Sequence, residues 1–170
     1  EESRNRVKFY ATQARDQAPH YEHTRIGYNY RLSNVCAGIG RGQMLSLPSF
    51  LEKRRGIHEE YRRRLSGVPG LSLLENPDSR YHSNHWLTCV QVNPEEARFD
   101  RETLRLALQK AGVESRPLWK PMHLQPVFRS CPFYGSGVSD RLFEEGLCLP
   151  SGASLAGEDM DRIIDVLLNL

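Results

Sequence analysis

The 170-residue sequence lacks the features that mark several classes of protein. No apolar run approaches the roughly 20 residues of a membrane-spanning helix, and no stretch has the pattern of a signal peptide. Its four cysteines lie far apart without a Cys-x-x-Cys pair, which argues against a disulfide framework and a zinc site and favours a reducing compartment. They are Cys36, Cys89, Cys131 and Cys148. We therefore expect a cytoplasmic protein with no metal and no membrane contact.

The excess of positive charge is also small. Lys and Arg number 23 against 21 Asp and Glu, which leaves a formal net charge of +2. Such a balance implies no polyanion partner unless the cations gather on one face, and Arg62–Arg64 falls on a solvated helix face. No Gly-rich phosphate loop, Ser-His-Asp arrangement or pair of catalytic acids is recognisable. We expect no nucleic-acid partner.

The residues that are present predict a folded chain that begins with helices. Hydrophobic residues make up 39% and charged residues 26%, as is typical of globular domains. A helix is expected over residues 3–15, followed by an irregular stretch over 16–33. Ser33 or Asn34 can cap a helix that runs to about Leu47. Pro48 should interrupt the pattern, and a second helix should cover 49–65.

After Gly67 the pattern changes to short strands that alternate with helices, which predicts an open α/β layer. Asp100 can cap the first of these helices, and Gly112 can end it. The expected strands are 71–74, 85–92, 113–116 and 147–149; the expected helices are 100–111, 139–145 and 157–170. The last helix should bury Met160, Ile163, Ile164, Leu167 and Leu168.

Two loop clusters carry the chemistry of a binding site. Tyr28, Asn29 and Arg31 place a phenol, an amide and a planar guanidinium together, and the latter two suit a phosphate. A turn whose aromatic rings fill a core is the alternative. The second cluster, residues 116–126, holds Trp119, Lys120 and His123 between prolines and suits an anionic ligand with a stackable ring. A proline-stiffened crossover with its tryptophan in the core is equally consistent.

A third grouping, His82, His85 and Cys89, has residue types that bind metals. Residues three apart in a strand point to opposite faces, so the two histidines would not converge. We interpret them as ordinary polar residues.

Ordered motifs over nearly the whole chain resemble a known family. They are Gly27-Tyr28-Asn29-Tyr30-Arg31-Leu32-Ser33-Asn34 with the small-residue helix that follows, the helix containing residues 50–55, Arg116–His123, and Gly146–Gly152. Together they are similar to the DegT/DnrJ/EryC1/StrS sugar aminotransferases, which depend on pyridoxal 5'-phosphate. The resemblance implies the aspartate aminotransferase fold, also called fold-type I.

The family fold implies two portions for this chain. Residues 1–65 would be C-terminal helices and an interface loop of the large cofactor domain. Residues 66–170 would be the small C-terminal α/β (α+β) domain, with a mixed or antiparallel sheet and flanking helices. The family acts as homodimers with shared active sites. Its members transfer an amino group from glutamate to a keto carbon of a nucleotide-linked sugar, in cell-surface polysaccharide or glycan biosynthesis.

The resemblance also implies roles for single residues. Asn29 would contact the pyridoxal phosphate of the partner subunit through its phosphate. Substrate-binding positions would be Tyr28, Arg31, Trp119, Lys120 and His123, and their local sequence looks most like members that use UDP-4-keto-6-deoxy-N-acetylhexosamines. The Schiff-base lysine would lie upstream of Glu1, so no catalytic residue is expected in the chain, and the chain alone would be inactive. Its own lysines, Lys8, Lys53, Lys110 and Lys120, do not match that motif.

Two other interpretations remain open. The parent protein could be a non-catalytic sensor or regulator of the same family, or the chain could be a nucleotide-sugar or nucleic-acid binding module. In each case the helices within 34–65 should expose apolar surface, which predicts a dimer or higher oligomer.

Overall fold

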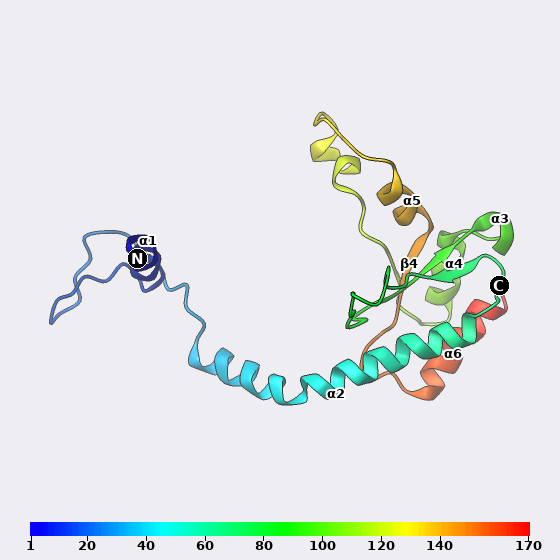
Figure 1. Ribbon diagram of the computed structural model, residues 1–170, viewed down its shortest axis with the longest axis horizontal. Coiled ribbons are helices and arrows are strands. Elements are labelled where there is room, and N and C mark those ends of the chain that lie inside the picture. Colours follow the sequence, from blue (N-terminus) through cyan, green and yellow to red (C-terminus); the bar gives the residue numbers. More distant parts are fainter. The chain divides into compact units, whose positions relative to one another are not determined.

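The computed structural model describes residues 1–170 as two compact units, Glu1–Leu47 and Pro48–Leu170 (Figure 1). The boundary lies within a helix. The expected assignment of residues 1–65 and 66–170 to two domains of a larger enzyme stays a prediction, because each unit is described by its own contacts alone.

The first unit begins with helix α1, Glu2–Ala11. The prediction of a helix to residue 15 was wrong at its end. The Thr12 hydroxyl donates to the Lys8 carbonyl at 2.8 Å, and Gln13 and Ala14 then adopt positive φ angles of 69° and 49°. Residues in the left-handed region commonly end a helix, and they are usually glycine or asparagine. Here they are glutamine and alanine, so the sequence contains no such signal.

Helix α2, Asn34–Leu65, runs through Pro48 without a break, so the expected interruption there was wrong. The Ser33 hydroxyl accepts a hydrogen bond from the Cys36 N–H at 3.2 Å, which confirms the expected N-cap. Proline removes the hydrogen bond to the carbonyl four residues earlier, that of Met44. Met44 is exposed, so water can satisfy this carbonyl.

The second unit contains a four-stranded antiparallel sheet of order β1-β2-β4-β3. Its strands are β1 Leu71–Leu73, β2 Thr88–Val92, β3 Arg116–Pro117 and β4 Gly146–Leu149. The α/β class with an antiparallel sheet and flanking helices is therefore confirmed. The remaining elements are α3 Pro94–Ala97, α4 Arg101–Lys110, the 3-10 turns η1 Met122–Leu124 and η2 Pro126–Phe128, α5 Val138–Glu145 and α6 Gly157–Leu168.

The helices of this unit begin and end for local reasons. The Asp100 carboxylate accepts the Thr103 N–H at 2.7 Å, which confirms the predicted cap of α4. Gly112, with φ of 72°, follows the helix as expected. None of the helices of the chain combines the length and the apolar composition that crossing a membrane requires.

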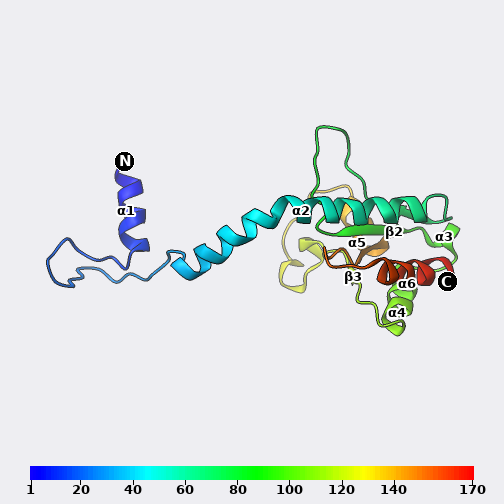
Figure 2. The ribbon, with the colours of Figure 1, turned by 90° about the horizontal axis from the view of Figure 1, so that it is seen from below.

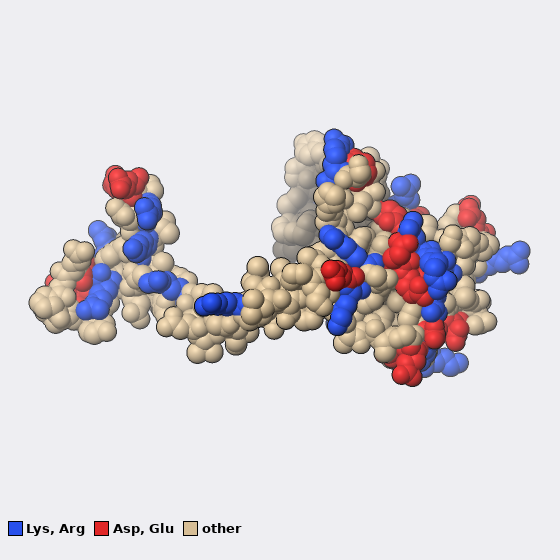
Figure 3. Space-filling view, turned by 60° about the horizontal axis from the view of Figure 1, so that its bottom comes forward, with Lys and Arg blue, Asp and Glu red and all other residues tan.

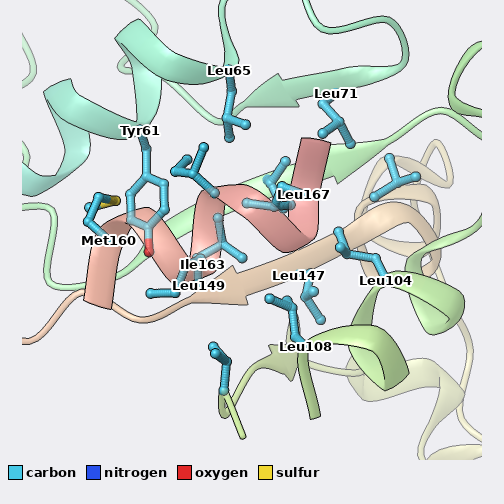
Figure 4. Close-up of a cluster of buried hydrophobic side chains, with 14 residues drawn as sticks. Tyr61, Leu65, Leu71, Leu104, Leu108, Leu147, Leu149, Met160, Ile163 and Leu167 are labelled. Carbon is cyan, nitrogen blue, oxygen red and sulfur yellow. The ribbon is translucent and has the colours of Figure 1, made fainter. Parts of the chain in front are cut away.

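One face of the sheet forms the core, as Figure 4 shows. Side chains alternate along a strand, so Val90 and Val92 of β2 and Leu147 and Leu149 of β4 share this face. Helices α2, α4 and α6 cover it, and Figure 2 shows α2 lying along the sheet. The Tyr61 hydroxyl of α2, inside this core, donates to the Pro150 carbonyl at 3.0 Å. The other face carries α5, which contacts β2 and β4.

Most boundaries shift by one or two residues, and three departures from the prediction have a local cause. The strand expected from residue 85 begins at Thr88, because His85 has a φ of 43° that a strand does not allow. The strand expected at 113–116 is reduced to Arg116–Pro117, while Val113 packs in the core. Leu168 ends α6 half-exposed rather than buried, since only the first three turns face the sheet.

Candidate functional site

The first candidate loop is held by backbone pairing with the end of α1. The Gln13 N–H donates to the Tyr28 carbonyl and the Tyr30 N–H to the Ala11 carbonyl, both at 3.1 Å. Gly27 lies against this turn so closely that a Cβ atom there would be 2.6 Å from the Ala14 backbone. Only glycine fits such an approach. These contacts fix the direction in which Asn29 emerges.

Asn29 and Arg31 line one hollow of about 390 Å³. The Asn29 Oδ1 accepts the Arg31 N–H at 3.0 Å, whereas the Asn29 amide nitrogen and the Arg31 guanidinium make no hydrogen bond or ion pair within the chain. Asn34, the first residue of α2, lines the same hollow, and the positive end of a helix favours an anion. The hollow therefore offers an amide, a guanidinium and a helix start to a phosphate.

Tyr28 lies outside this hollow. Its ring packs edge-on against Tyr30 with centroids 6.1 Å apart, and both rings are largely exposed. The alternative in which the aromatics of this loop fill a core does not hold within the unit, where Ala14 is the one buried residue.

The second candidate loop contributes to a larger pocket of about 600 Å³ at the β3 edge of the sheet. Trp119 stands there beside Trp86, with ring centroids 5.9 Å apart and the planes tilted by 31°. Trp119 is 66% exposed, so the alternative that buries it in the core is wrong. Polar groups on the walls come from Glu114, Ser115, Arg116, Ser151, Asp159 and Arg162. Two open indole faces with two guanidinium groups suit a planar ring attached to an anion.

His123 and Lys120 lie outside this pocket. The His123 ring stacks on Phe133 with centroids 3.6 Å apart, and its Nε2 lies 2.7 Å from the Asp140 carboxylate. The ring is mostly enclosed, and its Nδ1 makes no hydrogen bond within the chain. Lys120 is exposed, with its ammonium unpaired; only its carbonyl is bonded, by Gln125.

Sequence reasoning missed three residues of these sites: Trp86, Phe133 and Asp140. Trp86 was read as an apolar strand residue, although it lies in the loop before β2. The only feature that could have marked Trp86 as a pocket residue was its position near the start of a strand, where an aromatic side chain can point away from the core. Phe133 and Asp140 are far from His123 in sequence, and nothing in their local pattern marks them.

A buried polar cluster holds the loop that carries Trp86. His58 of α2 is buried, and its ring stacks on that of His85 with centroids 3.7 Å apart. Its Nε2 lies 3.3 Å from the Glu75 carboxylate. Arg54 and Arg55 of α2 donate to the carbonyls of Trp86 and Ser83. His85 is thus held by stacking on His58, whereas His82 is exposed and lies outside this cluster.

Burial, the neighbouring His58 and Arg55 lower the pKa of His85, while the Glu75 carboxylate opposes them. A histidine with a lowered pKa is held neutral in the folded chain near neutral pH. Protonation of His85 would therefore work against the stacked arrangement and its burial.

All four lysines of the chain are exposed. A lysine that acts as a nucleophile is usually desolvated or placed beside another cation so that its amine is neutral. None of Lys8, Lys53, Lys110 and Lys120 has such an environment.

Comparisons with known proteins identify relatives over nearly the full chain. Residues 1–168 match the DegT/DnrJ/EryC1/StrS aminotransferase family. EpsN of Bacillus subtilis, whose assignment as a pyridoxal phosphate-dependent aminotransferase is itself provisional, is 38% identical over 97% of this chain. The GDP-perosamine synthase of Vibrio cholerae is 29% identical over 88% of it. The chain spans 42% and 40% of these two proteins.

The solved structures that resemble the fold are also aminotransferases. The crystal structure of the aminotransferase TlmJ from Streptoalloteichus hindustanus superimposes with a TM-score of 0.82 at 27% identity. The match covers 99% of this chain and 44% of that one. Sequence and fold thus both identify an aminotransferase of this family, and in both comparisons the chain covers less than half of the relative.

We expect the His85→Asn variant to flatten the pH dependence of stability. Because the folded pKa of His85 lies below the unfolded value, unfolding takes up a proton as the pH falls, so its contribution is full above about pH 6.5 and is lost below it. Asparagine tolerates the positive φ and does not titrate. Urea unfolding at about pH 7.5 and about pH 5.5 measures the difference.

The exposed His82 of the same loop provides the control, as His82→Asn. An unchanged pH dependence in His85→Asn, or an equal flattening in both variants, would contradict this account of the cluster.

Proposed function

Because the chain belongs to the DegT/DnrJ/EryC1/StrS aminotransferase family, we propose that it is the C-terminal part of a pyridoxal phosphate-dependent sugar aminotransferase. The whole protein moves an amino group from glutamate to a keto carbon of a nucleotide-linked sugar, with a UDP-4-keto-6-deoxy-N-acetylhexosamine as substrate. The similarity to the Vibrio GDP-perosamine synthase supports a nucleotide-linked sugar. We place the reaction in the cytoplasm and in cell-surface polysaccharide or glycan biosynthesis.

The observation that carries this proposal is the hollow shared by Asn29 and Arg31. Its amide N–H and guanidinium groups are free of protein partners, and it opens at the start of α2. These donors fit the phosphate of the cofactor, so Asn29 would hold that phosphate for the partner subunit, and Arg31 would meet the diphosphate of the substrate. The bound cofactor supplies a conjugated ring that withdraws electrons from the carbon undergoing amino transfer.

The pocket of Trp86 and Trp119 supports the nucleotide part of the substrate. Its indole rings can stack on a pyrimidine, and Arg162 of its walls carries a charge that suits phosphate oxygens, whereas Arg116 is paired with Glu114. His123 would contact the sugar through Nδ1, because its Nε2 faces Asp140. Tyr28 and Lys120 are kept as substrate contacts on the family resemblance alone.

The lysine that carries the cofactor would come from a part of the parent protein outside this chain, since all four lysines here are exposed. A parent with histidine at that position would favour the regulatory alternative, so the reading frame upstream of Glu1 distinguishes the two. The third alternative, a stand-alone binding module, is addressed by the ligand titration below.

We expect the chain alone to transfer no amino group. Glutamate, pyridoxal phosphate and a UDP-4-keto sugar should give no aminated sugar by mass spectrometry, and borohydride should fix no cofactor on a single lysine in stoichiometric amount. A relative with the full family length, assayed in parallel, shows that the reagents are competent. One specifically labelled lysine, with activity lost in its arginine variant, would overturn this expectation.

We expect UDP-N-acetylglucosamine to quench the tryptophan fluorescence of the chain in a saturable way. The two tryptophans of the sequence both line the pocket, so the signal comes from that site. Trp119→Ala should lower the affinity about tenfold, since stacking on an aromatic ring contributes roughly 1–3 kcal/mol. Because Arg31 of the partner subunit would meet the same ligand in the homodimer proposed below, Arg31→Ala should lower it by a similar factor through the lost charge-assisted bond.

Arg25→Ala is the control, because it removes an equal charge from the same unit outside the Asn29 hollow. GDP- and dTDP-sugars identify the base that binds best. Equal effects of the two arginine variants, or tighter binding of duplex DNA with a steep salt dependence, would contradict a nucleotide-sugar site.

We further propose a homodimer, in which Asn29 serves the site of the partner. The first part of α2, over residues 34–47, carries one charged residue, Arg41, and Figure 3 shows few charged atoms there. Val35, Ile39 and Leu45 are 73%, 62% and 84% exposed. A helix segment with a single charge and several exposed apolar side chains suits an interface.

We expect light scattering at high concentration to report a dimer or higher oligomer, and Leu45→Glu to lower its association constant because the charge would be desolvated in the interface. Arg41→Glu is the control, because this position of the helix already carries a charge and the substitution introduces the same glutamate. A monomeric wild-type chain would rule out association through this helix.

A further inference from the structure

Two cysteines lie directly opposite each other in the sheet. Cys89 of β2 pairs with Cys148 of β4, and their Sγ atoms are 3.8 Å apart. Arg116 of β3 pairs with Cys148 on its other side. Directly opposed residues point to the same face of a sheet, so the two thiols and the guanidinium form one row across three strands. The row lies on the face opposite the hydrophobic core.

The positions allow a covalent bond. Opposed residues of an antiparallel pair have Cα atoms about 4.5–5.5 Å apart, and disulfides span about 4.4–6.8 Å. Rotation about the Cα–Cβ bonds can bring the sulfur atoms from van der Waals contact into bonding distance. The other two cysteines, Cys36 and Cys131, are exposed and unpaired.

The two thiols differ in reactivity and access. Cys148 lines the pocket of Trp86 and Trp119 but is itself buried, whereas Cys89 is partly exposed. The hydrogen bond with Cys89 and the charge of Arg116 lower the pKa of Cys148. The same hydrogen bond and burial raise the pKa of Cys89. The pair thus places a thiol with a lowered pKa next to one with a raised pKa.

We propose that Cys89 and Cys148 form a redox-active dithiol, which a low-molecular-weight disulfide of the glutathione type converts to a cross-strand disulfide. The Cys148 thiolate attacks one sulfur of the reagent, whose S–S bond breaks, and one thiolate leaves and takes up a proton. Cys89 then releases its proton to solvent and attacks Cys148, and the second thiolate leaves. Two protein thiols are oxidised, and one reagent disulfide is reduced to two thiols.

The cysteine pair is connected through β3 to the loop that carries Trp119. β3 is two residues long and leads through Leu118 to Trp119. Cys148 is flanked by the β3 pairing, so a bond that draws β2 and β4 together acts on the strand from which the tryptophan loop begins. The proposal does not rest on the aminotransferase assignment, because neither thiol takes part in it.

The test uses the chain with Cys36→Ser and Cys131→Ser, which removes the exposed thiols. Oxidised glutathione should lower its intact mass by two hydrogens, leave no thiol for iodoacetamide, and give one linked pair of peptides containing residues 89 and 148. Dithiothreitol should reverse the change. The same linked peptides are sought in the unsubstituted chain, so the result does not depend on the variant folding.

Two further substitutions assign the roles. With Cys89→Ser added, Cys148 should retain one glutathionyl group, because no second thiol displaces it. With Cys148→Ser added, the remaining thiol should react at least about tenfold more slowly, since burial raises its pKa and the thiolate is the reacting form. Two thiols still alkylated after treatment, a retained adduct in the protein with both cysteines, or disulfides between chains would each overturn the proposal.

Discussion

The pairing of β2 with β4 is the constraint on which the rest of the second unit depends. It sets Val90 opposite Leu147 and Cys89 opposite Cys148. Because side chains alternate along a strand, this one register sends the aliphatic residues to α2, α4 and α6 and the sulfur atoms to the other face. A shift by one residue would turn the thiols to the core face and the leucines to the opposite face. The core and the candidate sites are therefore two consequences of the same hydrogen-bond ladder.

The sheet alone does not position the tryptophan pocket. Trp86 lies in the long connection between β1 and β2, and this connection is fixed to α2 by polar contacts: the His58–His85 stack, the Glu75 carboxylate and the two arginine bonds. Apolar burial stabilises the strands, while charge and ring stacking order the loop. The loop is thus sensitive to pH in a way that the core is not.

Much of this fold could be predicted from local chemistry. Asp100, Ser33 and Gly112 act as the helix signals that their types suggest, and α6 follows its apolar period. The errors lie where local rules compete with context. Pro48 is tolerated because its helix is solvated there, and α1 ends through left-handed residues that are neither glycine nor asparagine. The strand from residue 85 was shortened by the stacking of His85 on a helix nearly thirty residues earlier.

The candidate sites were predictable to a different degree. Asn29 and Arg31 are two residues apart, so a single turn brings them into one hollow, and the sequence pattern was sufficient for that. Trp119 and Trp86 are joined only by tertiary folding, and the same holds for His123 with Asp140 and for the two central cysteines. Sequence spacing identified none of these three pairs. Scattered cysteines, in particular, look unpaired until the strand register is known.

The stability of the first unit depends on the ligand or partner that binds to it. Ala14 is its one buried residue, and α1 buries none. Hydrophobic burial, the main source of stability in folded chains, is therefore almost absent from this unit. The Asn29 hollow is held instead by a few backbone hydrogen bonds and the close approach of Gly27. Such bonds contribute only about 1 kcal/mol each when water competes for their groups. A phosphate in the hollow or a second chain on the apolar face of α2 would add the missing free energy, so ligand binding and assembly should each favour the other.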